Sequence, residues 1–138
     1  MGREVTGVER RVEIEDDPVG ARDYVVCRVE ELPTGSRKLV PVGKFGVGVF
    51  NVGGEYHAIT NYCPHAGGPL CLGRVGGMTL PRDDLPEKME WVREGEILKC
   101  PWHLWEFDIA TGTTIAQPAK RIRTYEVRVE EGMVILRR

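Results

Sequence analysis

The sequence predicts an all-β fold, an antiparallel sandwich or barrel. Its apolar residues occur in short runs rich in β-branched side chains, and glycine- or proline-containing turn signals separate the runs at close intervals. Over residues 121–129 apolar and polar side chains alternate except at Arg123-Thr124, which is typical of a half-buried antiparallel strand. Many short strands with turns this close favour a sandwich or barrel over a parallel sheet.

The first half of the chain contains four expected strands. Gly53-Gly54 joins the last two as a hairpin, because glycine accepts the positive φ angles of two-residue turns. The expected strands cover residues 24–29, 38–42, 45–50 and 56–59.

The second half is expected to hold a strand at 96–99, a turn at 108–113 and a closing pair of strands. That pair covers residues 121–129 and 133–136 and is turned at Glu131-Gly132.

Length and composition are those of an ordinary globular protein of one domain. The chain has 138 residues, of which 41% are hydrophobic and 29% charged, and residues 1–21 form a charge-dense N-terminal arm. A net charge of −2 gives no reason to expect a nucleic-acid partner. Apolar runs are too short for a membrane span and no secretion signal begins the chain, so we expect a cytoplasmic location.

Two short loops combine cysteine and histidine. The first reads Cys63-Pro64-His65-Ala66-Gly67-Gly68-Pro69, and the second reads Cys100-Pro101-Trp102-His103. Each loop supplies one thiolate and one imidazole at close spacing, and proline stiffens both. The sequence therefore predicts a metal site with two cysteine and two histidine ligands.

This ligand set suits either a tetrahedral zinc ion or a [2Fe–2S] cluster whose two irons have different donors. In the cluster, two ferric ions, two sulfides and two thiolates sum to a neutral charge, whereas four thiolates would give −2. An added electron then meets less repulsion, so histidine ligation raises the reduction potential from about −400 mV to roughly −150 mV or above. The ligands alone leave both metals open.

The paired loops resemble those of the Rieske iron–sulfur proteins. The matching residues are C-P-H-x-G-G-P-L from Cys63, C-P-W-H-x-W-x-F-D from Cys100, and the turn at Thr111-Gly112. The chain is most similar to Rieske-type ferredoxins and to the Rieske domains of ring-hydroxylating oxygenases, over residues 22–138. The resemblance implies a Rieske-type β fold with a small cluster-binding subdomain at about 61–117, formed by the two loops.

By the same resemblance, Cys63 and Cys100 bind one iron of a [2Fe–2S] cluster, and His65 and His103 bind the other. Trp102, Trp105 and Phe107 are expected to exclude water from the cluster, to pack in the core, or to do both. Residues expected to surround the cluster are Pro64, Gly68, Pro69, Pro101, Trp102, Trp105 and, in a third loop over it, Pro118.

The chain departs from the family pattern in two places. Residues of about 73–92 look like an insertion, either a partner-docking or cluster-shielding loop or a solvated excursion. Respiratory Rieske proteins join the two loops by a disulfide, but Trp102 occupies the position of one of its cysteines, so that bridge is excluded. Cys27 and Cys71 are expected to be small buried residues.

The resemblance implies a one-electron carrier that takes electrons from a flavin reductase and passes them to an oxygenase. With three histidines in all, only His57 remains beside the ligands, so this chain cannot build the two-histidine iron site of an oxygenase. No catalytic activity of its own is expected. The alternatives are a small redox subunit of a larger oxidoreductase complex and a structural zinc module.

High-potential Rieske proteins place serine and tyrosine hydroxyls close to the cluster. Trp105 and Phe107 stand at the corresponding positions and offer no hydroxyl. With fewer hydrogen bonds to stabilise the reduced state, a potential at the low end of the family range is expected, near roughly −150 mV.

Overall fold

The computed structural model describes residues 22–64, 67–102, 105–116 and 120–138. The expected N-terminal segment, residues 1–21, lies outside the described residues. Within these ranges no helix is long and apolar enough to cross a membrane.

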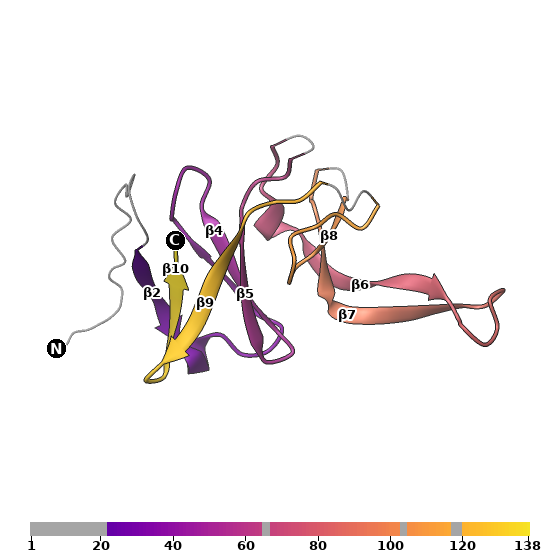
Figure 1. Ribbon diagram of the computed structural model, residues 1–138, viewed down its shortest axis with the longest axis horizontal. Helices are drawn as coiled ribbons and strands as arrows, with labels where there is room; N and C mark the ends of the chain where they lie inside the picture. Colours follow the sequence, from indigo (N-terminus) through magenta and orange to yellow (C-terminus); the bar gives the residue numbers. More distant parts are fainter. Residues whose placement is uncertain (1–21, 65–66, 103–104, 117–119) are drawn as a thin grey trace.

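A six-stranded antiparallel sheet forms the body of the molecule (Figure 1), in the order β2-β10-β9-β5-β4-β3. All six strands contribute side chains to one core, around which the sheet wraps. The antiparallel all-β prediction is confirmed. The strands are β2 (Asp23–Arg28), β3 (Arg37–Val40), β4 (Val47–Val52), β5 (Glu55–Thr60), β9 (Thr124–Glu130) and β10 (Met133–Arg137), and a short 3-10 helix, η1 (Val29–Glu31), follows β2.

The predicted turns are confirmed at Gly53-Gly54 between β4 and β5, and at Glu131-Gly132 between β9 and β10. β9 begins three residues later than predicted. Arg121 and Ile122 are tied to the 108–113 turn, since Arg121 bridges to Thr113 and the Ile122 amide donates to the carbonyl of Gly112 over 2.8 Å. The Arg123 carbonyl already bonds to the large sheet, accepting from the Thr60 amide of β5 over 3.1 Å.

A second, three-stranded sheet has the order β6-β7-β8. It consists of β6 (Arg74–Pro81), β7 (Met89–Lys99) and β8 (Glu106–Asp108). The segment 73–92, expected to be a loop, instead contributes most of a long β6–β7 hairpin that projects from the body (Figure 1). Its glycines and prolines hid this strand pairing, because it depends on contacts between the two strands rather than on local preference.

Strand β4 and the residues Ala58 and Ile59 of β5 are buried on both faces, because a second core lies between these strands and the small sheet. Val47 and Val49 of β4 point into the first core, whereas Phe50 belongs to the second. In β5, Ala58 and Ile59 divide between the two cores in the same way. This division follows the alternation of side chains along a strand.

The small sheet begins where the backbone of Gly73 lies against that of Lys99, next to the first β6–β7 pair, Arg74 and Lys99. A Cβ atom added at Gly73 would lie 1.7 Å from the carbonyl oxygen of Lys99, so only glycine fits. The short helix η2 (Leu70–Leu72) ends directly before Gly73. Arg37 of β3 secures this junction by donating to the carbonyls of Cys71 and Gly73 over 2.7 and 2.5 Å.

Replacing Gly73 with alanine is expected to destabilise the fold, because the new methyl group overlaps a backbone carbonyl that cannot move without breaking β6–β7 pairing. Forced overpacking of this kind costs roughly 1–3 kcal/mol or more. Thermal unfolding of the Gly73→Ala protein, followed by circular dichroism, measures the loss.

Gly76→Ala is the matched control on the same strand. Its added Cβ would meet nothing closer than a ring carbon of Trp91 at 3.7 Å, an ordinary contact. Equal unfolding temperatures for the two variants would show that the Gly73–Lys99 junction does not constrain the fold.

Candidate metal centre

The first loop begins at Cys63, three residues after β5 ends. Backbone hydrogen bonds close it at both ends: the Cys63 amide donates to the Gly68 carbonyl over 2.9 Å, and the Gly67 amide donates to the Cys63 carbonyl over 2.6 Å. The Cys63 side chain has no exposed surface. β5 thus delivers this cysteine into the interior at the base of a tight loop.

The second loop repeats this arrangement. Cys100 directly follows β7, its side chain has no exposed surface, and its amide donates to the carbonyl of Trp105 over 2.8 Å. In both loops the cysteine amide therefore bonds to the carbonyl five residues further on. β8 begins immediately after Trp105, so the second loop is held between two paired strands.

Cys63 and Cys100 belong to the same hydrophobic core. The structure therefore brings together the two predicted thiol ligands from loops that are far apart in sequence, in an apolar setting from which water is excluded. Their buried neighbours are Phe50, Ile59, Leu70, Cys71, Leu98, Phe107, Ile109 and Ile122. Among the described residues, no three or more Cys, His, Asp or Glu side chains form a group able to hold a metal ion.

Trp102 is not a core residue, so the expectation of core packing is wrong for this side chain. Trp102 is 58% exposed, and its ring lies across Gly68 of the first loop, where an added Cβ would come within 2.8 Å of the indole. The glycine thus lets the second loop cover the first. Pro64 and Pro101 are exposed, and Pro69 is half-buried.

The other aromatic residues of the second loop do pack inward. Phe107 is fully buried in the same core as the two cysteines, and Trp105 packs against this core while half-buried. Core packing is therefore confirmed for Phe107 and Trp105, whereas Trp102 lies over the first loop.

Three predicted site residues, His65, His103 and Pro118, lie outside the described residues. The remaining histidine, His57, lies on β5 as predicted. Its side chain is 25% exposed and its Nε2 is 3.4 Å from Oε1 of Glu55.

Cys71 is buried as predicted, and the structure shows what it does. Its thiol fills the space over Gly48, where an added Cβ would lie 2.5 Å from Sγ, and its amide donates to Oδ1 of Asn61 over 2.8 Å. Cys71 thus anchors η2 to β4. The alternation of apolar residues and glycines along 45–50 indicated that another segment packs closely on this strand, but it did not identify Cys71 as that segment's residue.

Burial raises the pKa of the Cys71 thiol to about 12, because a thiolate would lose its hydration there. Burial also raises the pKa of Cys27. Both are free cysteines.

Comparison with known proteins places this arrangement in a family. The model of the Rieske [2Fe–2S] domain matches residues 22–126. The chain belongs to the Rieske [2Fe–2S] family. Its cofactor is accordingly a Rieske-type [2Fe–2S] cluster rather than zinc, and two buried cysteines in one apolar core suit such a cluster.

Rieske relatives occur both as separate small proteins and as parts of longer chains. The chain is 27% identical over 110 residues to the ferredoxin component of the naphthalene 1,2-dioxygenase/salicylate 5-hydroxylase systems of Ralstonia sp, covering 79% of this chain and 88% of that protein. It is 28% identical over 121 residues to apoptosis-inducing factor 3 of Mus musculus, covering 87% of this chain but only 17% of that protein. The solved Sphingomonas yanoikuyae B1 ferredoxin superposes with a TM-score of 0.61 at 29% identity, covering 85% and 99% of the two chains.

Cys71 is expected to resist alkylation in the folded protein at pH 8.5, since only a thiolate reacts and its pKa of about 12 leaves almost none. Iodoacetamide labelling followed by peptide mass spectrometry measures this for each cysteine. Because the pKa is raised on folding from an ordinary value of 9.0, the neutral thiol stabilises the fold fully below about pH 9. That contribution is lost as the pH rises towards 12.

The unfolded protein is the control and should be labelled at Cys71 rapidly. The Cys71→Ala variant should give no labelled peptide at this position, and its free energy of unfolding should fall less as the pH rises from 9 towards 12. Equal rates of Cys71 labelling in the folded and unfolded protein would contradict the buried placement.

Proposed function

We propose that this chain is a one-electron carrier that accepts an electron from a flavin reductase and passes it to an oxygenase. The observation that carries this proposal is the match of the Rieske domain over residues 22–126, in a chain whose two loop cysteines are buried in one core. When bound, the cluster supplies a one-electron acceptor whose potential is raised by histidine ligation.

In this proposal Cys63 and Cys100 hold one iron and His65 and His103 hold the other. Support for the cysteines comes from their complete burial and from the matching hydrogen bonds that close the two loops. Support for the histidines comes from the spacing of the two motifs. The chain's own contribution is to keep water from the thiolates and to hold both loops rigidly, so that little rearrangement accompanies a change in charge.

Residues around the ligands are proposed to act through this rigidity. Proline follows each cysteine, and Pro69 closes the first loop. The carbonyl of Gly68 accepts a hydrogen bond from the Cys63 amide, and the carbonyl of Trp105 accepts one from the Cys100 amide. Gly68 also lies under the ring of Trp102. Pro118 is proposed to complete the site from a third loop.

The proposal of an oxygenase as acceptor is supported by relatives of similar length. One is the Ralstonia ferredoxin component, and another is the 3-phenylpropionate/cinnamic acid dioxygenase ferredoxin subunit of Escherichia coli, 26% identical over 111 residues. Both are named as parts of dioxygenase systems. By analogy we propose an oxygenase as acceptor, a flavin reductase as donor, a cytoplasmic location and no catalytic activity of the chain alone.

The alternative is a small redox subunit of a larger oxidoreductase complex. Two observations favour it: a similar domain occupies 17% of the much longer apoptosis-inducing factor 3, and the β6–β7 hairpin projects from the body with exposed apolar side chains. A carrier purifies alone as a stable small protein, whereas a subunit purifies with its complex.

Cys63→Ser is expected to abolish cluster binding, because a serine hydroxyl at ordinary pH is a poor substitute for a buried thiolate ligand. The wild-type protein, purified without oxygen, should be red-brown, hold two irons and bleach with dithionite while gaining a rhombic EPR signal. The variant should retain neither the iron nor the signal.

Cys27→Ser is the matched control, since Cys27 is also buried but lies in the other core. It should keep full iron content. Zinc without iron in the reconstituted wild type would overturn the carrier proposal, and full iron in the Cys63→Ser protein would overturn the ligand assignment.

A redox titration is expected to give a midpoint potential of about −150 mV, at the low end of the Rieske range. Phe107→Tyr should raise it by adding a hydroxyl in the core that holds both cysteines. Cys27→Ser, which adds its hydroxyl in the other core, should leave it nearly unchanged. A wild-type midpoint above about 0 mV would contradict this low-potential assignment.

A further inference from the structure

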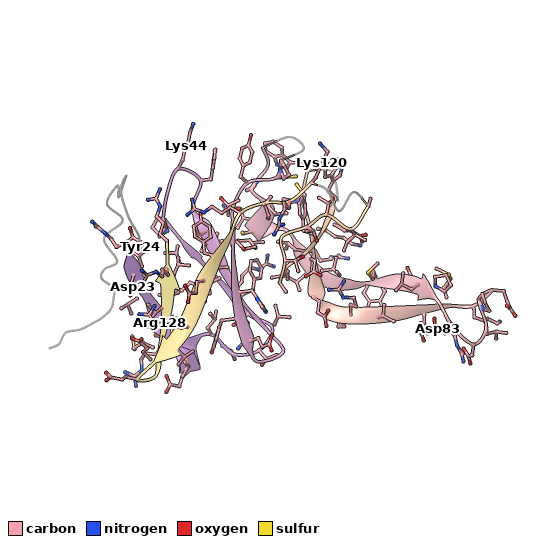
Figure 2. All side chains as sticks on the ribbon, in the orientation of Figure 1. Asp23, Tyr24, Lys44, Asp83, Lys120 and Arg128 are labelled. Carbon is pink, nitrogen blue, oxygen red and sulfur yellow. The ribbon has the colours of Figure 1, made fainter. Side chains whose placement is uncertain are left out.

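The distal part of the β6–β7 hairpin, residues 78–92, is here called the arm. It projects away from β8, with Asp83 near its far end and Lys44 on the body (Figure 2). β6 pairs only with β7, and β7 pairs with β8 only from Ile97 onwards, so within the described residues the arm is a two-stranded ribbon with no third strand. Such a ribbon alone is only marginally stable in water.

One face of the arm is apolar and exposed. The register pairs Thr79 with Trp91 and Pro81 with Met89, and these two pairs, one step of alternation apart, share a face. Met89 is 58% exposed and Trp91 55%. Large apolar side chains gathered on an exposed surface commonly mark an interaction site.

Trp91 is held in position rather than left to rotate. Its indole N–H donates to Oε1 of Glu94 over 2.6 Å. A tryptophan fixed before binding loses little entropy on contact, which is why tryptophans frequently dominate the energy of protein interfaces.

The arm also has a fixed direction. Gly77 lies opposite four residues of β7, 93–96, where the pairing shifts. Arg93, at the start of this bulge, donates to Asp108 over 2.6 Å and to Glu96 over 2.7 Å, and both bonds raise its pKa. Since Asp108 ends β8, the arm is tied to the strand that follows the second metal loop.

Charge around the apolar face selects the partner. Residues 82–90 carry four carboxylates against two cations, and pairing of Arg82 with Asp84 at 2.7 Å leaves three carboxylates against Lys88. Two arms meeting face to face would bring like charges together. A different protein with arginine and lysine around an apolar recess would complement both the apolar face and its acidic rim.

We propose that the arm is a docking site for a protein partner with an apolar, basic-rimmed surface, and that it lies apart from the cluster loops. The partner holds the carrier by the arm while the loops remain free to exchange electrons. This proposal extends the carrier function, but the contact itself needs no electron transfer.

The test begins with a photo-crosslinking amino acid placed at Met89 in the full-length, cluster-containing protein, inside cells of the organism from which the chain derives. The same amino acid at Val129, which is 47% exposed on β9, is the positional control. A protein crosslinked from Met89 and not from Val129 is then purified and titrated against the carrier by calorimetry.

Trp91→Ala is expected to weaken binding to that protein by at least about tenfold, because it removes the central anchor. Asp83→Asn together with Glu87→Gln should weaken it less and flatten its dependence on salt. Val129→Ala should bind like the wild type. All variants should keep the cluster's absorption spectrum and midpoint potential, so loss of docking is distinguished from loss of the redox centre.

Several results would overturn the proposal. They are crosslinks only to a second copy of this chain, crosslinks to residues 1–21 of the same chain, equal yields from Met89 and Val129 or none from either, and unchanged affinity of the Trp91→Ala protein. A colourless, iron-free protein that still docks through Trp91 would instead overturn the carrier function and leave the docking site standing.

Discussion

The contact between the backbones of Gly73 and Lys99 brings together the segment that follows Cys63 and the segment that precedes Cys100. Gly73 follows the first metal loop and η2, while Lys99 directly precedes Cys100, so this one contact sets the two loops relative to each other. Hydrogen bonds from Arg37 to the Gly73 carbonyl and from the Cys71 amide to Asn61 extend it to the large sheet. Because backbone groups make this junction, the loops are held by parts of the chain that side-chain motion hardly disturbs.

Strands β4 and β5 connect the loop cysteines to the large sheet. Their alternate residues serve two cores, one inside the large sheet and one containing both loop cysteines. The loops therefore have no core independent of the body. Gly48 shows how tightly the layers fit, since the Cys71 thiol occupies the place where a larger side chain would stand. The stability of the centre is consequently that of the whole domain.

The sequence was sufficient for local features and for the motif, but not for contacts between distant segments. Strands β2, β4, β5 and β10 and their glycine turns were predictable because alternation and turn chemistry are local signals. The β6–β7 hairpin was not, since Gly76, Gly77 and Pro81 indicate a loop and only cross-strand pairing overrides them. The exposure of Trp102 and the packing of Cys71 on Gly48 likewise depend on segments brought together by folding.

Arg93 shows that the hairpin's direction is specified at some cost to the backbone. Its φ of 59° is a left-handed conformation that glycine adopts without strain, whereas a residue with a side chain gives up about 1 kcal/mol or more. Glycine here would remove the strain and also the bonds to Glu96 and Asp108, of which Asp108 is only 16% exposed. The chain thus keeps a strained arginine whose ion pairs join the bulge to β8. A hairpin that only filled space would need no such connection, but one that presents a binding face at a fixed angle to the second metal loop does.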